Sequence, residues 1–275
     1  MSNFLIGIFI LIFCFFFLEN ILNFYTKNIH KVFLDKPNFR SMHKIPKPTG
    51  GGILILTTSL ASYFIWNFTT DFNISNHLVL KILLISTPLS IISFYDDLKN
   101  ISQKFRYFIQ LLTGLLLIFN SELIQLASLD LNFFVFLLIK ILFLIFITGI
   151  INITNFMDGI DGLVVGSFSI IFLALTIKFD LNLFLISFIL LCFLKWNWQP
   201  AAIFMGDSGS TLLGSIFAGI LINTQSYFEF LSILFLYTPL LIDSSTCLIW
   251  RFWNGYNIFT AHKMHLYQRL VLGGL

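Results

Sequence analysis

Long apolar runs restrict this chain more than any other feature of its sequence. A stretch of about 18 or more apolar residues is long enough to cross a bilayer as a helix, and several stretches here reach that length. Hydrophobic residues make up 57% of the chain and charged residues 11%, whereas charged residues make up about 25% of a typical soluble domain. We therefore expect an all-α, polytopic integral membrane protein.

Nine apolar runs predict about nine transmembrane helices, within a single membrane-embedded domain that covers residues 1–275. Two of the runs are short for a hydrocarbon core about 30 Å thick, so their ends must extend into the flanking residues. The first run is not expected to be a cleaved signal peptide, because no basic residue precedes it and no small-residue cleavage site follows it. The nine runs are residues 3–24, 51–68, 78–94, 107–119, 133–151, 163–179, 183–198, 212–224 and 228–250.

The basic residues predict how these helices are oriented. Lysine and arginine are concentrated in alternate connections, namely residues 25–50, residues 95–106 and the end of the chain, and are absent from the intervening connections. By the positive-inside rule the basic connections are cytoplasmic and the N-terminus lies outside. The polar segments described below then all face the cytoplasm, so the active-site loops are expected there. Lys140 lies deep within its run, and the sequence gives no account of it.

A polar segment at residues 152–163 separates two long apolar runs. Its amides and carboxylates recur at every third position: Asn152, Asn155, Asp158 and Asp161. Gly159 and Gly162 make a long regular helix unfavourable there and allow the backbone to approach a ligand closely. Because an unpaired carboxylate at the centre of a membrane helix is costly, these side chains are expected at the water interface or against a cation or polar ligand. The alternative is a solvated loop that caps the next helix.

Two other acidic segments lie at the ends of apolar runs. Asp96 and Asp97 are adjacent, and two adjacent carboxylates repel each other unless a cation or a proton lies between them; the alternative is a solvated helix end. The segment Gly206-Asp207-Ser208-Gly209-Ser210 precedes the run that starts at residue 212. Its amides suit an anion and its carboxylate suits a hard cation such as Mg²⁺, whereas the alternative is an ordinary helix cap.

Basic side chains gather at the C-terminal end, at His262, Lys263, His265 and Arg269. Such a cluster suits a phosphate or pyrophosphate, although positive charge beside a membrane can also serve only to set topology. The basic, proline- and glycine-containing loop at residues 35–52 could contact anionic lipid or substrate. Asp243 lies inside the last run, and an ionisable residue within a membrane span is a functional candidate by default.

Taken in order, these segments resemble the polyprenyl-phosphate N-acetylhexosamine-1-phosphate transferases, glycosyltransferase family 4. The resemblance runs from Asp35 to Arg269, and its most specific part combines the Asp96-Asp97 pair with the polar segments at 152–162 and 206–210. Asp35-x-Pro37-Asn38 and Gly50-Gly51 also agree with the family pattern. At the C-terminal end, the translocase group of the family carries consecutive histidines, whereas this chain reads His262-Lys263-Met264-His265-Leu266-Tyr267-Gln268-Arg269. That end is more similar to the O-antigen-initiating subgroup.

The resemblance implies Mg²⁺-dependent transfer of a sugar 1-phosphate from a UDP-sugar to undecaprenyl phosphate, with release of UMP. The sugar would be an N-acetylhexosamine or a 6-deoxy-N-acetylhexosamine, and Mn²⁺ is an alternative metal. Asp207 would bind the metal. The implied catalytic residues are Asp96, Asp97, Asp158 and His265. The implied substrate-binding residues are Lys47, Lys99, Lys104, Asn152, Asn155, Asp161, Gly206, His262, Lys263 and Arg269.

The resemblance also implies a place in the cell and a set of partners. The expected location is the bacterial cytoplasmic membrane, with undecaprenyl phosphate, a UDP-sugar and the bilayer as partners, no nucleic acid, and a homodimer as one possible assembly. A cation-coupled transporter is an alternative, but its ionisable groups would lie near the bilayer midplane at the interface of repeats. The chain ends at Leu275, where family members usually enter a further helix. An inactive, truncated relative is therefore a second alternative.

Overall fold

The structure, a computed structural model, is almost entirely helical. It describes residues 2–29, 33–35, 37, 45–69, 78–99, 101–121, 124, 132–178, 182–257 and 264–273. Within these ranges the only strands are two-residue β1 (Leu34–Asp35) and β2 (Lys47–Pro48), which pair antiparallel. The predicted all-α class is confirmed.

Eight of the nine predicted runs each form one helix. The helices are α1 (Ser2–Phe24), α2 (Gly51–Thr69), α3 (Leu78–Lys99), α4 (Gln103–Phe119), α6 (Phe133–Met157), α7 (Leu163–Lys178), α8 (Leu183–Asn197), α9 (Gly206–Leu221), α10 (Tyr227–Leu236), α11 (Thr238–Trp253) and α12 (Leu266–Leu272). A π-helical turn, Tyr25–Ile29, follows α1.

The last predicted run, residues 228–250, is not one helix. It is divided into α10 and α11, which are bent by 76° relative to each other. Pro239 lies in the first turn of α11, where the backbone N–H that proline lacks would have no partner within the helix. If α10 and α11 were one continuous helix, Pro239 would lie in its interior and remove a backbone hydrogen bond. The apolar pattern runs through this proline, which is why hydropathy alone predicted a single span.

Among the described residues, three helical segments are long and apolar enough to cross a bilayer, or four if the bent α10–α11 pair is a single broken span. They are Gly7–Asn28, Leu78–Lys99 and Phe133–Met157. Helices α7 and α8 are apolar but have only 16 and 15 residues, which at 1.5 Å per residue is less than a core about 30 Å thick. The protein is thus a polytopic membrane protein, while the number nine and the orientation stay predictions.

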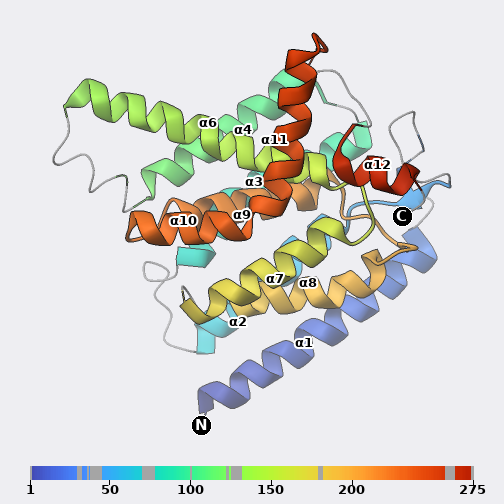
Figure 1. The fold of residues 1–275 in the computed structure, drawn as a ribbon. Helices are drawn as coiled ribbons and strands as arrows, with labels where there is room; N and C mark the ends of the chain where they lie inside the picture. The colour runs from blue at the N-terminus through green and yellow to red at the C-terminus, as the bar shows by residue number, and fades with distance from the viewer. Residues whose placement is uncertain are drawn as a thin grey trace.

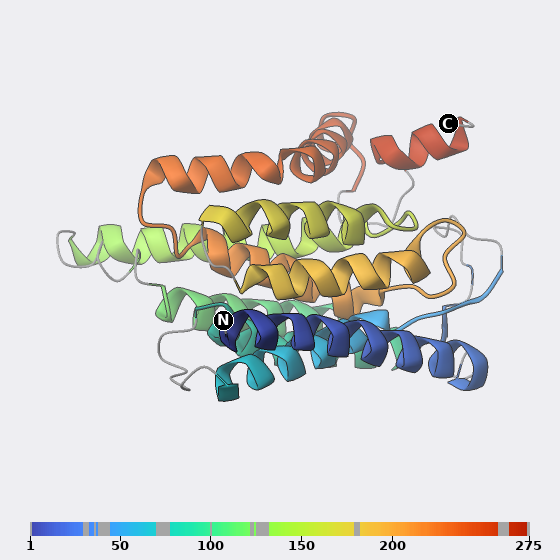
Figure 2. The ribbon, with the colours of Figure 1, turned by 90° about the horizontal axis from the view of Figure 1, so that it is seen from below.

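Helix α9 lies at the centre of the bundle. Nearly all of its residues are buried, and it packs against α3, α6 and α2. Gly52 of α2 and Gly209 of α9 allow a very close approach, since a Cβ atom on Gly52 would lie 2.1 Å from the backbone nitrogen of Gly209. Helices α7 and α8 lie side by side next to this centre (Figure 1). The C-terminal helices α10, α11 and α12 form an outer layer, with α1 toward the opposite side (Figure 2).

The polar segments extend the helices instead of forming loops between them. Helix α6 continues through both Asn152 and Asn155 to Met157, although the two later glycines had predicted no long regular helix there. Gly159 and Gly162 lie in the turn at 158–162 that follows the helix, and Gly162 has a φ of +77° there. Similarly, α3 continues to Lys99 and α9 begins at Gly206. The polar side chains are therefore held by rigid helix ends.

Candidate active site

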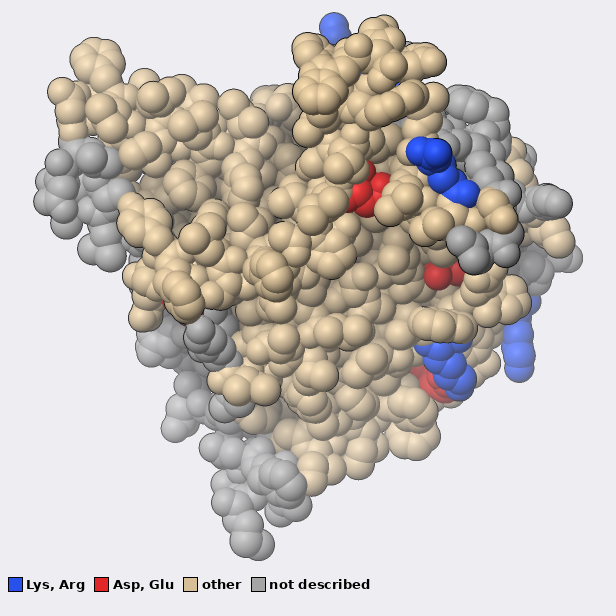
Figure 3. Space-filling view, in the orientation of Figure 1, with Lys and Arg blue, Asp and Glu red and all other residues tan. Residues whose placement is uncertain are grey.

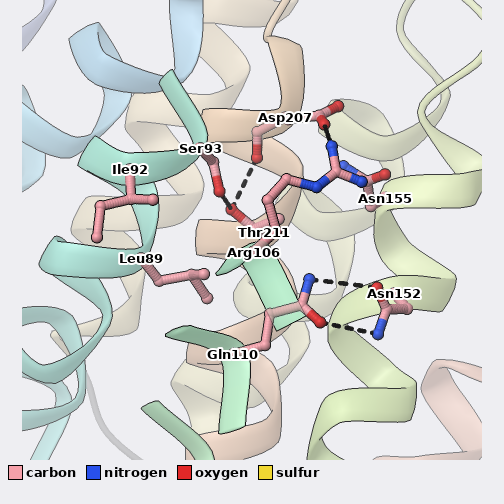
Figure 4. Close-up of a pocket in the computed structure, with 9 residues that line it drawn as sticks. All are labelled: Leu89, Ile92, Ser93, Arg106, Gln110, Asn152, Asn155, Asp207 and Thr211. Carbon is pink, nitrogen blue, oxygen red and sulfur yellow. Dashed lines mark hydrogen bonds and ion pairs between the residues drawn. The ribbon is translucent and has the colours of Figure 1, made fainter. Parts of the chain in front are cut away.

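The ends of four helices bring the predicted acidic residues together. Asp96 and Asp97 lie in the last turn of α3, and Asp207 lies in the first turn of α9. Asn155 comes from the last turns of α6, and Arg106 from the first turns of α4. In Figure 4, Arg106 extends between Asp207 and Asn155. Segments separated by more than 100 residues in the sequence thus form one polar cluster.

Arg106 joins the two acidic segments. Its Nη1 lies 2.5 Å from Asp96 Oδ2 and 2.9 Å from Asp207 Oδ2. Asp96 is nearly buried, and its other carboxylate oxygen accepts a hydrogen bond of 2.6 Å from the backbone N–H of Ile101. Asp207 keeps 35% of its side chain exposed. One carboxylate of the pair is thus locked in place, while the other remains accessible to a ligand.

Asp97 has one oxygen with a partner and one without. Oδ1 accepts a hydrogen bond of 3.3 Å from the backbone N–H of Asp207, at the beginning of α9. Oδ2 is buried and has no hydrogen-bond partner among the described residues. A Cβ atom on Gly206 would lie 2.5 Å from this oxygen and 2.7 Å from Thr49 Oγ1. With a φ of +74°, position 206 requires glycine both for its backbone conformation and for this close approach.

Asp158 follows α6 directly, as its C-cap residue. Burial, followed by the negative charges of Asp207 and Asp161, raises the pKa of Asp158 to about 8. The carboxylates from the central segment and from α9 therefore act on one another through space. Such a concentration of negative charge favours a bound cation or proton.

Asp161 connects the central turn to the N-terminal loop. Its Oδ2 lies 3.1 Å from Lys47 Nζ and accepts a hydrogen bond of 2.8 Å from the backbone N–H of Ala201. The Lys47 ammonium also lies 5.0 Å from the centre of the Phe204 ring. Two residues that were predicted separately as substrate-binding are therefore an ion pair at the edge of the cluster.

A pocket lies between α3, α4, α6 and α9 (Figure 4). One side is apolar, formed by Leu89 and Ile92, and the remaining lining residues are polar. Asn155 Nδ2 donates a hydrogen bond of 3.0 Å to Ser210 Oγ. The lining residues are Leu89, Ile92, Ser93, Arg106, Gln110, Asn152, Asn155, Asp207 and Thr211.

Arg106 and Gln110 are two polar site residues that the sequence did not predict. Arg106 was interpreted only as a topogenic charge. Gln110 exchanges two hydrogen bonds with Asn152, of 2.9 and 3.2 Å, and so fixes the orientation of that amide. A signal was present, because residues four apart lie on the same face of a helix. Arg106 and Gln110 are four residues apart, on one face of α4.

The other predicted basic residues lie outside this cluster or outside the described residues. Lys99 and Lys104 are exposed, and the Lys99 ammonium lies 4.8 Å from the centre of the Tyr95 ring. Arg269 is exposed on α12. His262 and Lys263 belong to the residues that the structure does not describe. The predicted roles of these five side chains stay predictions.

His265 is buried at the start of α12. Its Nδ1 lies 3.7 Å from Asp243 Oδ1, and its ring stacks on that of Tyr267 with centres 5.5 Å apart. Burial lowers the pKa of His265, and the nearby Asp243 carboxylate opposes this shift. The Tyr267 hydroxyl donates a hydrogen bond of 2.9 Å to the carbonyl oxygen of Phe156 in the last turn of α6. The C-terminal end is thereby attached to the central segment.

Most of the charged side chains visible in Figure 3 gather toward the side of the molecule where α12 lies. Lys140 is a charged residue within an apolar run. Its ammonium lies 4.2 Å from the centre of the Phe136 ring and 5.3 Å from that of Phe119. Cation–π contacts of this kind stabilise a cation away from water. The gathering of charge at one end agrees with the predicted single-sided site.

The donor groups suit a magnesium ion that is completed by substrate. Within the described ranges, no three His, Cys, Asp or Glu residues are grouped closely enough to form a metal site by themselves. Mg²⁺, however, usually keeps several waters and is bound by one or two carboxylates together with substrate phosphates. The accessible Asp207 carboxylate and the unpartnered Asp97 Oδ2 fit that kind of incomplete site.

The protein is similar to one family of known transferases. The sequence matches glycosyl transferase family 4 over residues 79–225. It is 28% identical to undecaprenyl-phosphate alpha-N-acetylglucosaminyl 1-phosphate transferase of Thermotoga maritima, over 73% of this chain and 59% of that protein. It is 26% identical to probable undecaprenyl-phosphate N-acetylglucosaminyl 1-phosphate transferase of Bacillus subtilis, over 88% and 70%.

A third relative, phospho-N-acetylmuramoyl-pentapeptide-transferase of Streptococcus sanguinis, is 30% identical over 84% of this chain and 76% of that protein. The chain thus spans between 59% and 76% of the length of these three relatives. The relatives carry names for two different sugars, so similarity does not choose between them. Together with the match over 79–225, which contains the four helix ends of the cluster, these similarities show that the chain belongs to glycosyl transferase family 4.

Proposed function

We propose that the protein transfers a sugar 1-phosphate from a UDP-sugar to undecaprenyl phosphate in a bacterial cytoplasmic membrane. An oxygen of the lipid phosphate attacks the β-phosphorus of the UDP-sugar, the bond between the two phosphates breaks, and UMP leaves. The products are a polyprenyl-diphosphate sugar and UMP. This reaction would initiate a cell-envelope polysaccharide such as an O-antigen.

The observation that carries this proposal is the Arg106 bridge between Asp96 and Asp207, which lies beside a pocket with one apolar wall. The reaction brings two anions together, so it depends on cationic groups placed before the substrates arrive. Arg106 is planar and can bind phosphate through two N–H groups. Because Asp96 holds it, little reorganisation is needed when a phosphate approaches.

Mg²⁺ is the metal we propose, held by Asp207 with Asp97 as the second carboxylate. When bound, it would neutralise phosphate charge and polarise the phosphorus–oxygen bonds. Asp97 and Asp96 would orient the lipid phosphate, and Asp158 would act from the centre of the cluster. Asn155 and Asp161 would hold the nucleotide, with Asn152 kept in orientation by Gln110.

A transfer assay with isolated membranes tests the proposal. Membranes that contain the protein would be incubated with undecaprenyl phosphate, Mg²⁺ and a panel of radiolabelled UDP-sugars, and the lipid extract would be separated by thin-layer chromatography. We expect labelled lipid from an N-acetylhexosamine or 6-deoxy-N-acetylhexosamine donor, with release of UMP. Release of UDP would indicate transfer of the sugar without its phosphate and would contradict the proposal. Membranes with the Asp207→Asn variant are the matched control.

A further inference from the structure

Asp243 is an almost fully buried carboxylate inside α11, with 8% of its surface exposed. A carboxylate within an apolar helix is costly unless other groups satisfy its oxygens. Here Oδ1 accepts a hydrogen bond of 2.7 Å from the backbone N–H of Leu266, and Oδ2 accepts one of 3.2 Å from that of Tyr267. Both donors belong to the first turn of α12, where N–H groups have no partner within the helix. Asp243 therefore fixes the beginning of α12 from a different helix.

Tyr267 continues this connection toward the cluster of carboxylates. Its hydroxyl donates to the carbonyl oxygen of Phe156, one of the acceptors that the end of α6 leaves unsatisfied. It also lies directly against the following turn, because a Cβ atom on Gly159 would be 2.2 Å from the Tyr267 hydroxyl oxygen. Tyr267 thus contacts the chain on both sides of Asp158.

Hydrogen bonds therefore connect Asp243 to the start of α12, and Tyr267 of α12 to the end of α6. We propose that Asp243 and Tyr267 are positioning residues: Asp243 fixes the start of α12, and Tyr267, held there, fixes the turn that carries Asp158. The inference rests on the proposed function, because it assigns the turn a role in transfer. Neither side chain needs to touch a substrate.

Two conservative variants separate this role from a general one in folding. Tyr267→Phe keeps the ring and removes only the hydroxyl that reaches Phe156. Asp243→Asn keeps the shape but replaces one of the two accepting oxygens with an N–H₂ group, so one cap bond is lost. Thr246→Ala is the matched control, because Thr246 is an exposed residue one turn further along α11 whose hydroxyl bonds only within its own helix.

Hydrogen–deuterium exchange of the purified full chain in lipid nanodiscs measures the connection without turnover. Local opening raises exchange in the affected segment alone. We expect Asp243→Asn to raise exchange in residues 264–273 and also in residues 156–162, each by about tenfold. Tyr267→Phe should raise exchange in residues 156–162, and Thr246→Ala should change neither segment. If Asp243→Asn loosens only residues 264–273, or if Tyr267→Phe leaves residues 156–162 unchanged, the proposal is wrong.

Steady-state kinetics with the UDP-sugar then show whether this connection positions the reacting groups. A displaced catalytic group lowers turnover more than ground-state binding, and a displacement of about 1 Å can cost a hundredfold. We expect both variants to lower kcat about tenfold or more with KM changed less than about twofold. A change in exchange with kcat unaltered would overturn the positioning role. If the wild-type protein transfers no sugar phosphate at all, the proposed function fails, and the exchange result alone decides on the connection.

Discussion

The two sides of the site are held by different kinds of contact. On the side of α3, α4 and α9, charged side chains contact each other directly, with Arg106 between Asp96 and Asp207. On the C-terminal side, the turn that carries Asp158 is reached through neutral contacts, chiefly the hydroxyl of Tyr267 on a backbone carbonyl. The charge there is one step removed, on Asp243.

This difference indicates a division of work. A charge change on the α3–α4–α9 side alters the field that the phosphates meet, and such electrostatic contributions are usually the largest in catalysis. A change on the C-terminal side alters where a carboxylate lies, without altering the charge of the cluster. The first kind of change should therefore lower the rate of transfer more than the second.

The largest effect is expected for Asp207→Asn. The amide is nearly isosteric, but it loses the negative charge that attracts a hard cation and that holds Arg106. Transfer should fall by about a thousandfold or more, measured as the initial rate of labelled lipid formation over a range of Mg²⁺ concentrations. Glu229→Gln is the matched control, since Glu229 is the acidic residue in the first turn of α10. A near-normal rate with the same Mg²⁺ optimum would show that Asp207 is only a helix cap.

Arg106→Gln should have the next largest effect. It removes the charge from the phosphate site and leaves the nearly buried Asp96 without its ion pair, so kcat should fall about a hundredfold. Arg106→Lys keeps a charge but loses the planar fork, and should cost less. Lys104→Gln, two residues earlier and exposed, should cost clearly less than either. If Lys104→Gln lowers kcat more than Arg106→Gln does, the Arg106 bridge is not the functional arrangement.

Sequence alone predicted which segments are helical better than it predicted where one helix is divided or how many helices span the membrane. Run length and hydropathy are local properties, and they placed α1, α2 and α3 within a few residues at their beginnings. The bend at Pro239 was missed because the residues on both sides of it are equally apolar. The number of spans could not be settled either, since α7 and α8 are apolar but shorter than the bilayer core.

The site was predicted as a set of acidic segments but not as a set of contacts. Spacing within each segment is visible in the sequence, and Asp96, Asp158 and Asp207 were all found in that way. Pairing between segments depends on helix packing, so the bridge by Arg106 could not be predicted from a charge that also sets topology. For Asp243 the same limit applied: an intramembrane acid indicates function in general, and only the structure shows that its partners are the backbone N–H groups of α12.

A smaller effect is expected on the C-terminal side. His265 is buried beside Asp243, and burial lowers its pKa, which favours the neutral imidazole. His265→Ala should lower kcat at least about tenfold, less than the hundred- to thousandfold of a lost direct donor, with KM for the UDP-sugar changed less. Lys27→Ala, at an exposed basic residue after α1, should be nearly silent. Equal, small effects from both variants would mean that the basic end only sets topology.

The last prediction concerns Asp158 and the dependence of stability on pH. Burial, followed by the charges of Asp207 and Asp161, raises the pKa of Asp158 to about 8 in the folded protein, whereas an unfolded Asp titrates near ~3.9. The folded state therefore binds a proton that the unfolded state has already released. Its stabilising contribution is complete below pH ~3.9 and is lost as the pH rises through about 8.

Thermal unfolding in detergent without divalent cations should show this loss between pH 5 and pH 9. For a chain of this size, each kcal/mol lost lowers Tm by about 2–4 °C. Asp158→Asn cannot titrate, so its Tm should depend less on pH over this range. Mg²⁺ should reduce the dependence in the wild-type protein, because a bound cation stabilises the carboxylates that alkaline pH creates. A wild-type Tm that rises toward pH 9, or a variant with the same slope as the wild type, would show that Asp158 is not held protonated in the folded protein. The charge of Asp207 on one side of the site would then have little effect on Asp158 on the other side.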